Sequence, residues 1–407
     1  MKIVLVDIQS KTNLIINKDL SGGFGTSSNF GKSFFSKALI KIKKDSVKVP
    51  ILMLGYLSRI LKDNGHEVEF STTDKLSNAD LYIIYSSLIE HSAEINFAKK
   101  IKKETDSKVA FVGPFATFKP EIFLEISDFV VAGEPEQFAM NLNDDIPKGL
   151  IASTKLENLD DLPFPDWKPF KIDTFSYSHY LNKKNVFTSM LTSRGCPYSC
   201  SYYCPYPGFQ GDKMRYRSVD NVLNEIEYLI DNYNVRSILF RDPIYTLDMK
   251  RAQKISEGII KRKLNIEWVC ETHFDRLNRD LIMIMQDSGL KGINVGIESP
   301  NEDVLKNISR KSSKKSHQED LINFSEKLGV KIGAFYILGT EFDDKKTIEQ
   351  TIEYSKKLNT SFAQFTLSTP YPGTKFFDDI SKNIYEKKWD NFDIYTPTFS
   401  SPNFSSE

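Results

Sequence analysis

The chain has 407 residues, of which 40% are hydrophobic and 27% charged, so it is neither a single small module nor a disordered or low-complexity chain. Its 54 basic side chains are matched by 54 acidic ones, which argues against a large cationic footprint for nucleic acid, although a local basic patch at 37–48 remains possible. Apolar runs long enough to cross a bilayer are absent from the sequence. We expect a cytoplasmic protein with no nucleic-acid or membrane partner.

The first 145 residues alternate short apolar runs with helical periodicity. The expected strands are 3–7, 68–71, 81–86, 109–113 and 129–132, and the expected helices are 50–64 and 93–104. Strands separated by helices predict a parallel, doubly wound sheet. Ligands bind beyond the carboxyl ends of such strands, so this Rossmann-like half is expected to bind a ligand.

The rest of the chain begins with a proline-rich connection and continues as a second strand–helix series. Prolines in LPFPDWKPF interrupt periodicity between 146 and 185. Six strand–helix repeats follow within 186–375, which predicts an open, partial (β/α)6 barrel with its chemistry at the carboxyl ends of the strands. The aromatic, serine-rich residues 376–407 are expected to be a packed or mobile tail. The fold class is therefore α/β.

Three of the four cysteines lie within nine residues, in LTSRGCPYSCSYYCPYPG, at positions Cys196, Cys200 and Cys204. This clustering favours metal ligation in a reducing compartment over disulfides. Three thiolates can bind three irons of a [4Fe–4S] cluster and leave the fourth iron open. A zinc site completed by a distant histidine, or inert buried cysteines, are the alternatives. Cys270 is expected to pack in the core rather than to bind metal.

These residues resemble the radical S-adenosylmethionine (SAM) enzymes, and more narrowly the subclass with an N-terminal cobalamin-binding domain. In the second half the resemblance rests on TSRGCPYSCSYYCPYP, FRDPIYTLD, WVCETHFDRL, GINVGIES, YILGTEFDD and STPYPGTKFF. Earlier segments also carry it, namely GGFGTSSNFG, VKVPILMLGYLSRIL, VGPFATFKPE, AGEPEQF and LDDLPFPDW. It implies a cobalamin-binding domain at 1–145, a linker at 146–185, a radical SAM partial TIM barrel at 186–375 and a tail at 376–407.

The cysteine motif departs from the family pattern at one point. The family has two residues between its second and third cysteines, with an aromatic residue before the third, whereas SYY separates Cys200 from Cys204 here. If Cys204 is the third ligand, Tyr203 keeps the aromatic position and Ser201 or Tyr202 must bulge outward. Such a change in loop geometry could weaken cluster binding or abolish activity.

The resemblance also implies residues that contact SAM, which would chelate the open iron and be cleaved to methionine and a 5′-deoxyadenosyl radical. Asp242 is a candidate for the SAM amino group or ribose, and Glu298 for a ribose hydroxyl. His273 stands where relatives often carry an arginine, so it departs from the family pattern for holding the SAM carboxylate, and it is the cofactor-binding candidate at that position. Asp242 and Glu298 could instead be helix-capping or loop carboxylates.

A corrin is a broad, mostly apolar disc, and binding it needs an extended face that the backbone can approach closely. Residues beyond the first-domain strands fit this need, namely Gly22, Gly23, Gly25, Ser86, Ser87, Gly113, Pro114 and Gly133. The alternative, a dinucleotide site, is disfavoured because no G-x-G-x-x-G motif directly follows the first strand. The D-x-H-x-x-G pattern that supplies a histidine to cobalt is also absent, and His91 is expected in a solvated loop. The resemblance thus implies cobalt without a protein histidine.

The resemblance implies three functional hypotheses. The first is methylation of an unactivated carbon in a small-molecule substrate of unknown identity, using the 5′-deoxyadenosyl radical and methylcobalamin. The second is a radical cyclisation or rearrangement without methyl transfer, and the third is a degenerate, non-catalytic corrin-binding protein, motivated by the extra residue in SYY. Both catalytic hypotheses need an electron donor such as flavodoxin or ferredoxin.

Overall fold

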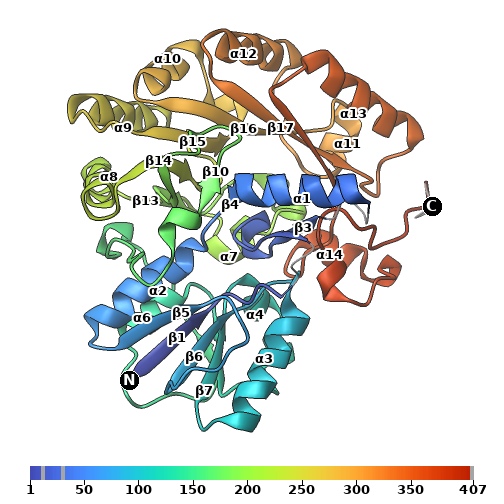
Figure 1. Cartoon of the computed structure of the whole chain (residues 1–407). Helices are drawn as coiled ribbons and strands as arrows, with labels where there is room; N and C mark the ends of the chain where they lie inside the picture. The colour runs from blue at the N-terminus through green and yellow to red at the C-terminus, as the bar shows by residue number, and fades with distance from the viewer. Residues whose placement is uncertain (11–13, 29–32, 404–407) are drawn as a thin grey trace.

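Two six-stranded parallel sheets organise the computed structural model, which describes residues 1–10, 14–28 and 33–403 (Figure 1). The first sheet has the order β5-β1-β6-β7-β8-β9. Its strands are β1 (Lys2–Val6), β5 (Glu67–Ser71), β6 (Leu81–Tyr85), β7 (Lys108–Val112), β8 (Phe129–Ala132) and β9 (Gly149–Ala152). The chain changes direction across the sheet between β1 and β6, and such switch points are where open α/β sheets bind ligands.

The five strands and two helices expected in the first half are confirmed, the helices being α2 (Leu52–Asp63) and α3 (His91–Glu104). Several elements were not predicted, namely β9, the hairpin β2 (Ile15–Asn17) and β3 (Thr26–Ser28), α1 (Phe34–Ser46), α4 (Pro114–Phe118), α5 (Pro120–Leu124) and α6 (Pro135–Met140). The missed helices α4 to α6 span only five or six residues, too few to show a helical period.

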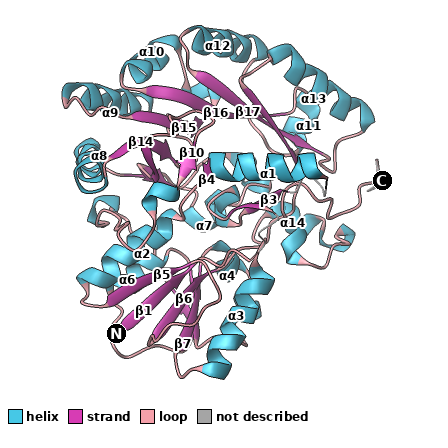
Figure 2. Ribbon diagram, viewed as in Figure 1, coloured by secondary structure: helices cyan, strands magenta, loops and turns pink. Residues whose placement is uncertain are grey.

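The second sheet has the order β11-β14-β15-β16-β17-β18, with every neighbouring pair parallel. Its strands are β11 (Val186–Met190), β14 (Val235–Phe240), β15 (Glu267–Thr272), β16 (Leu290–Glu298), β17 (Lys331–Leu338) and β18 (Phe362–Leu367). Figure 2 shows the helices on its outer side, namely α8 (Val219–Tyr233), α9 (Met249–Lys261), α10 (Arg279–Asp287), α12 (Lys315–Lys327) and α13 (Lys345–Leu358). The short helix α11 (Glu302–Asn307) follows β16. Because β11 and β18 remain the two edges of this curved sheet, the expected partial barrel is confirmed.

Local sequence signals explain where the barrel helices begin and end. The hydroxyl of Ser218 accepts a hydrogen bond from the backbone N–H of Asn221 and caps the start of α8. Asn234 ends that helix in the left-handed conformation, with φ +54°. The strand β14, which follows α8, is buried at five of its six positions, as a parallel strand covered by helices should be.

The proline-rich connection packs the two halves onto each other. Trp167 is fully buried, and a Cβ at Gly55 of α2 would lie 2.8 Å from its ring, so a larger side chain there would collide with it. Asp166 accepts hydrogen bonds from Lys62 of α2 and Tyr233 of α8. The core cluster around Trp167 therefore contains residues of both sheets.

The C-terminal residues are packed as far as residue 403. The short helix α14 (Lys375–Asp379) contributes Phe376, which is buried with Ile380 and Phe399. A bridge pairs Ile384 with Phe399, so the segment folds back on itself. Within the described chain, no helix has both the length and the apolar character needed to cross a membrane.

Candidate functional site

The cysteine loop follows β11 at the carboxyl edge of the second sheet. Cys196 and Cys200 are buried and Cys204 is partly exposed, and all three are free thiols. Gly195 precedes the loop with φ +95°, and a Cβ there would lie 2.1 Å from the carbonyl oxygen of Lys213. The chain can therefore turn into the loop only with glycine at this position.

The extra residue of the motif is taken up by a helical turn. A 3-10 turn covers Ser199–Tyr202, and the backbone N–H of Cys204 donates to the carbonyl oxygen of Cys200 over 2.9 Å. Side chains four residues apart on a helical turn lie on one face, and the thiols of Cys200 and Cys204 are indeed in hydrogen-bond contact. The added residue thus keeps both sulfur atoms together, while the hydroxyl of Tyr202 turns away to Glu341.

The thiols differ in acidity because their surroundings differ. The hydrogen bond from Cys204 lowers the pKa of Cys200 to about 7, with help from Arg310. Burial instead raises the pKa of Cys196 to about 11. Arg310 reaches Cys200 from the loop after α11, with its Nη1 3.8 Å from the sulfur. A cation beside the loop favours the thiolate form that metal ligation requires.

Arg310 also joins the cysteine loop to the end of β16. Its Nη2 donates to the carbonyl oxygen of Gly296 over 2.9 Å and lies 3.5 Å from Oε1 of Glu298. A Cβ at Gly296 would lie 2.3 Å from that oxygen, so glycine makes room for the pair. Glu298 is buried, hydrogen-bonded to Tyr203, and has φ +64°, a strained conformation for this residue type that points to a functional constraint.

Asp242 is fully buried and holds the entry to the cysteine loop. Its carboxylate accepts hydrogen bonds from the backbone N–H of Thr192 over 3.0 Å and the Thr192 hydroxyl over 2.7 Å. The Ser193 hydroxyl donates to it as well. Arg251 of α9 binds Thr192 from the other side, through its hydroxyl and its carbonyl oxygen. Asp242 therefore positions the loop rather than facing an open space.

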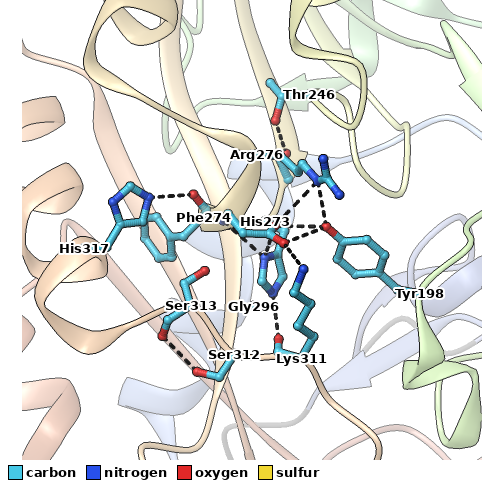
Figure 3. Close-up of polar contacts among 12 residues, drawn as sticks. Tyr198, Thr246, His273, Phe274, Arg276, Gly296, Lys311, Ser312, Ser313 and His317 are labelled. Carbon is cyan, nitrogen blue, oxygen red and sulfur yellow. Dashed lines mark hydrogen bonds and ion pairs between the residues drawn. The ribbon is translucent and has the colours of Figure 1, made fainter.

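His273 is engaged by its own surroundings, as Figure 3 shows. Its Nδ1 lies 2.5 Å from Oδ1 of Asp275, and its Nε2 donates to the carbonyl oxygen of Lys311 over 3.0 Å. Tyr198 of the cysteine loop donates to the same carboxylate over 2.9 Å and accepts from Arg276. Burial and the neighbouring Arg310 lower the pKa of His273 to about 4 against the effect of Asp275. His273 thus braces the cysteine loop with both ring nitrogens occupied.

Two buried ion networks join the first half to this loop. Arg194, two residues before Cys196, pairs with Glu134 over 3.1 Å and with Glu136 over 2.6 Å. Arg215 binds Glu134 as well. Burial alone would raise the pKa of Glu134, but Arg194 and Arg215 hold it below its usual value. The loop after β8 therefore binds the chain immediately in front of the cysteines.

The second network centres on Arg241, the residue before Asp242. Its guanidinium donates to Asp19 of the first half over 2.9 Å and to Glu271 of β15 over 2.6 Å. It also donates to the hydroxyl of Tyr206, over 3.0 Å, in the short helix α7 (Tyr206–Gln210) that follows Cys204. Arg194, Arg241 and Arg310 were not predicted as site residues, although the TSRGC and FRDP segments display the first two.

The eight residues expected to face a corrin gather at the carboxyl edge of the first sheet, but they are packed against protein. A Cβ at Gly22 would lie 2.8 Å from Pro205, and the carbonyl oxygen of Gly23 accepts from Tyr85. The hydroxyl of Ser86 donates to the carbonyl oxygen of Val112 in β7, and the hydroxyl of Ser87 donates to the carboxylate of Glu94 in α3. Gly25, Gly113 and Gly133 likewise approach neighbouring protein atoms. Gly22, Gly23 and Pro114 line a cavity of only about 70 Å³.

A larger cavity, of about 760 Å³, opens beside that edge, where β1 and β5 end. None of the eight expected residues lines it. Its polar lining comes from strand ends and from charged side chains of α1, β4 (Val47–Lys48) and the hairpin region, for example Asp7, Ser71, Thr72, Lys18, Lys44, Asp45 and Lys48. Its apolar lining comes from the hairpin, α2 and the connection, for example Ile15, Leu54, Phe170 and Phe175. Its volume and mixed lining suit a large organic ligand. The eight residues therefore lie at the carboxyl edge of the first sheet, but the cavity large enough for an organic ligand lies beside them.

Two minor expectations have clear outcomes. Cys270 is fully buried on β15 within the hydrophobic core, which confirms core packing. His91 is not in a solvated loop, because it is the first residue of α3 and its ring lies 3.1 Å from Asp390 of the C-terminal segment. The ring also packs edge-on against Phe115. The C-terminal segment covers this histidine, and no pattern in the sequence around His91 predicts that contact.

The donor set fits an iron–sulfur cluster better than a single ion. Among the residues that the structure describes, no group of three His, Cys, Asp or Glu side chains is arranged as a mononuclear metal site. The zinc alternative therefore gains no support. Three thiols in one loop, with a cation beside them and the fourth cysteine, Cys270, buried in the core, match a cluster that takes three protein ligands and leaves one iron open.

Comparison with known proteins agrees with this geometry. Residues 190–374 match the model of the Radical SAM superfamily. An uncharacterized methyltransferase of Pyrococcus horikoshii is 29% identical over 334 residues, covering 76% of this chain and 71% of that protein. The bacteriochlorophyllide d C-12(1)-methyltransferase of Chlorobaculum tepidum is 26% identical over 282 residues, covering 68% of this chain and 61% of that enzyme. The relatives also include anaerobic magnesium-protoporphyrin IX monomethyl ester cyclases.

Among solved structures, the radical SAM methyltransferase TsrM of Kitasatospora setae, with cobalamin and a [4Fe–4S] cluster bound, superimposes with a TM-score of 0.67. The match covers 94% of this chain and 75% of TsrM at 14% sequence identity, so it establishes a shared fold across both halves. Residues 190–374 therefore form a radical SAM domain, and a Rossmann-like sheet lies in front of that domain.

Proposed function

We propose that this protein is a cobalamin-dependent radical SAM enzyme that methylates an unactivated carbon of a small molecule. The observation that carries the proposal is the three-thiol loop, held in a radical SAM domain and bound through Arg194 to the carboxyl edge of a Rossmann-like sheet. Two relatives named as methyltransferases support methylation over other radical chemistry. This chain spans less than two thirds of the second of them, so the substrate is part of the proposal.

The domain roles follow the same reasoning. Residues 1–145, with β9 from the expected linker completing their sheet, would bind cobalamin. The remainder of 146–185 would connect the halves, 186–375 would carry the radical chemistry, and 376–407 would be the C-terminal segment. We place the corrin at the carboxyl edge of the first sheet and assign it the cavity of about 760 Å³, because the space beside Gly22 and Gly23 is far smaller. A reducing cytoplasm suits the free thiols, and a flavodoxin or ferredoxin would supply electrons.

Within the barrel, we assign a role to the three cysteines and to two carboxylates. When bound, the cluster supplies the electron that cleaves SAM, and cobalamin carries the methyl group. Cys196, Cys200 and Cys204 would hold the cluster. Glu298 lies beside them with a carboxylate suited to a ribose hydroxyl. Asp242 positions the loop through Thr192 and Ser193, so we assign it a supporting role and not a direct contact with SAM.

Anaerobic purification with cobalamin supplied tests the proposal. We expect about four irons per chain, a visible spectrum that contains both the cluster and the corrin, and cleavage of SAM under a reductant. Methylation consumes SAM in two ways, so both S-adenosylhomocysteine and 5′-deoxyadenosine should accumulate. Formation of 5′-deoxyadenosine alone would indicate cyclisation or rearrangement. Low iron with no SAM cleavage would indicate a degenerate, corrin-binding protein.

A further inference from the structure

Helix α1 exposes its apolar side chains to solvent instead of burying them. Phe34 is 88% exposed, Phe35 77% and Ile42 63%, whereas the next most exposed large hydrophobic residue of the described chain, Leu150, is 51% exposed. Large aromatic side chains are more stable when they are buried than when they are exposed to water. A cluster of them on a solvent-exposed face therefore marks an interaction surface.

The exposed residues form two parallel stripes along the helix. Phe34, Ala38 and Ile42 are spaced by four residues and so lie along one line, with Phe35 beside it. Lys37 and Lys41 share the same spacing and form a basic line next to the apolar one, also exposed. The apolar and basic stripes therefore face solvent together.

The opposite side of α1 anchors it to the protein. Ile40 is buried, and the carbonyl oxygen of Ser46 accepts a hydrogen bond from the backbone N–H of Ser178 over 2.8 Å. The strand β4 (Val47–Lys48) that follows pairs with β10 (Ser176–Tyr177). Figure 1 shows α1 lying across the front of the molecule at the level where the two halves meet. The stripes are thus presented on a fixed, convex helix.

The local charge identifies the partner. Residues 34–48 contain five lysines and one aspartate, a balance of +4 (5 − 1) in a chain whose total is +0. A convex helix with bulky apolar groups beside lysines matches a lipid bilayer, whose surface can be anionic and whose interior is apolar. An acidic protein would match the lysines but would leave the two phenylalanines without a complementary pocket.

We propose that α1 is a peripheral contact with anionic phospholipid bilayers. Phe34, Phe35 and Ile42 enter the boundary between head groups and acyl chains, and Lys37 and Lys41 contact lipid phosphates. This goes beyond the proposed function, because a surface contact requires no particular chemistry in the barrel. It also departs from the expectation of no membrane partner, which rested on the absence of a spanning segment.

Co-sedimentation of the full-length, reconstituted protein with vesicles tests the proposal. Vesicles of equal parts phosphatidylglycerol and phosphatidylcholine should bind the protein, and vesicles of phosphatidylcholine alone should bind it much more weakly. We expect Lys37→Gln with Lys41→Gln to lower the partition coefficient by about tenfold or more, and high salt to do the same. Phe34→Ser with Phe35→Ser should lower it on its own.

The helix α9 provides a matched control, since Lys250 and Lys254 are exposed at the same spacing and Ile260 is 41% exposed. Lys250→Gln, Lys254→Gln and Ile260→Ser together should leave vesicle binding unchanged. Absence of binding to anionic vesicles would overturn the proposal, as would equal loss in the α9 variant. The proposal would also be overturned if Lys37→Gln with Lys41→Gln left vesicle binding unchanged and weakened only electron transfer from an acidic flavodoxin. Iron content and SAM cleavage, measured on the same samples, report separately on the proposed function.

Discussion

Nη2 of Arg194 lies 2.6 Å from Oε1 of Glu136, and this contact joins the cysteine loop to the Rossmann-like half. Both side chains are almost completely buried, so water does not weaken their attraction. The cysteines thus owe part of their placement to residues about 60 positions earlier in the chain. In an enzyme that combines a cluster with a corrin, such a contact would keep the two cofactor sites in register.

Removing this contact should destabilise the protein. Arg194→Gln leaves Glu136 buried without its cation, and we expect a loss of about 3–5 kcal/mol in the free energy of unfolding, measured by urea denaturation. Arg59→Gln removes an exposed ion pair with Asp63 and should cost no more than about 1 kcal/mol. Equal effects of the two variants would contradict a structural role for Arg194.

Cysteine substitutions test the cluster ligands. Cys204→Ala should reduce iron to less than half of the wild-type content and abolish SAM cleavage, because a cluster held by two thiolates is poorly retained. Cys270→Ala removes a buried sulfur that lies in the hydrophobic core and should leave the iron content unchanged. Iron assays on anaerobically reconstituted protein distinguish the two results. Normal iron in Cys204→Ala would show that the third ligand lies elsewhere.

Glu298 should act on SAM affinity and not on the cluster. Glu298→Gln keeps the size of the side chain but removes the charge, and loss of one charge-assisted hydrogen bond should weaken SAM binding about 10- to 100-fold. Equilibrium binding of SAM to the reconstituted protein measures this loss, while iron content stays at the wild-type level. Glu302→Gln, an exposed position on α11, is the matched control and should have no effect.

The cavity at the ends of β1 and β5 can be tested by filling it. Thr72→Trp places a large ring in this space and should reduce bound cobalamin per chain at least several-fold without changing iron. Thr154→Trp adds the same ring at an exposed position and should bind cobalamin normally. Corrin absorbance after gel filtration gives the stoichiometry. Unchanged cobalamin in Thr72→Trp would place the corrin elsewhere.

Low pH should destabilise the contact between the two halves, because Asp166 becomes protonated. Burial alone would raise the pKa of this carboxyl, but hydrogen bonds from Lys62, from the N–H of Lys168 and from Tyr233 lower it below its usual value. A depressed folded-state pKa stabilises the fold above the unfolded pKa of about 3.9, and this stability is lost as pH falls through the folded value. Asp166→Asn should be less stable at neutral pH and show a smaller further loss below about pH 4. Thermal melts across this range measure both effects, and parallel curves for the two proteins would refute the assignment.

Much of the architecture could be predicted from local sequence. The barrel strands are short apolar runs, and helices such as α8 carry their own capping residues, so their positions follow from neighbouring residues alone. Strand ends also located Glu298 and Asp242 at the correct edge. The long-range contacts of the site were not predictable, because Arg310 meets Cys200 across 110 positions and Asp242 meets Thr192 across 50.

The sequence by itself determined the cysteine spacing, the order of strands and helices, and the surplus of lysines in α1. Only the tertiary structure decided that the extra residue coils into a helical turn, that the glycine-rich edge closes on Pro205 and Tyr85, and that Phe34 and Phe35 face outward. The physical reason is that spacing and periodicity act along a few neighbouring residues, whereas burial and cavities depend on which distant side chains fill the same space.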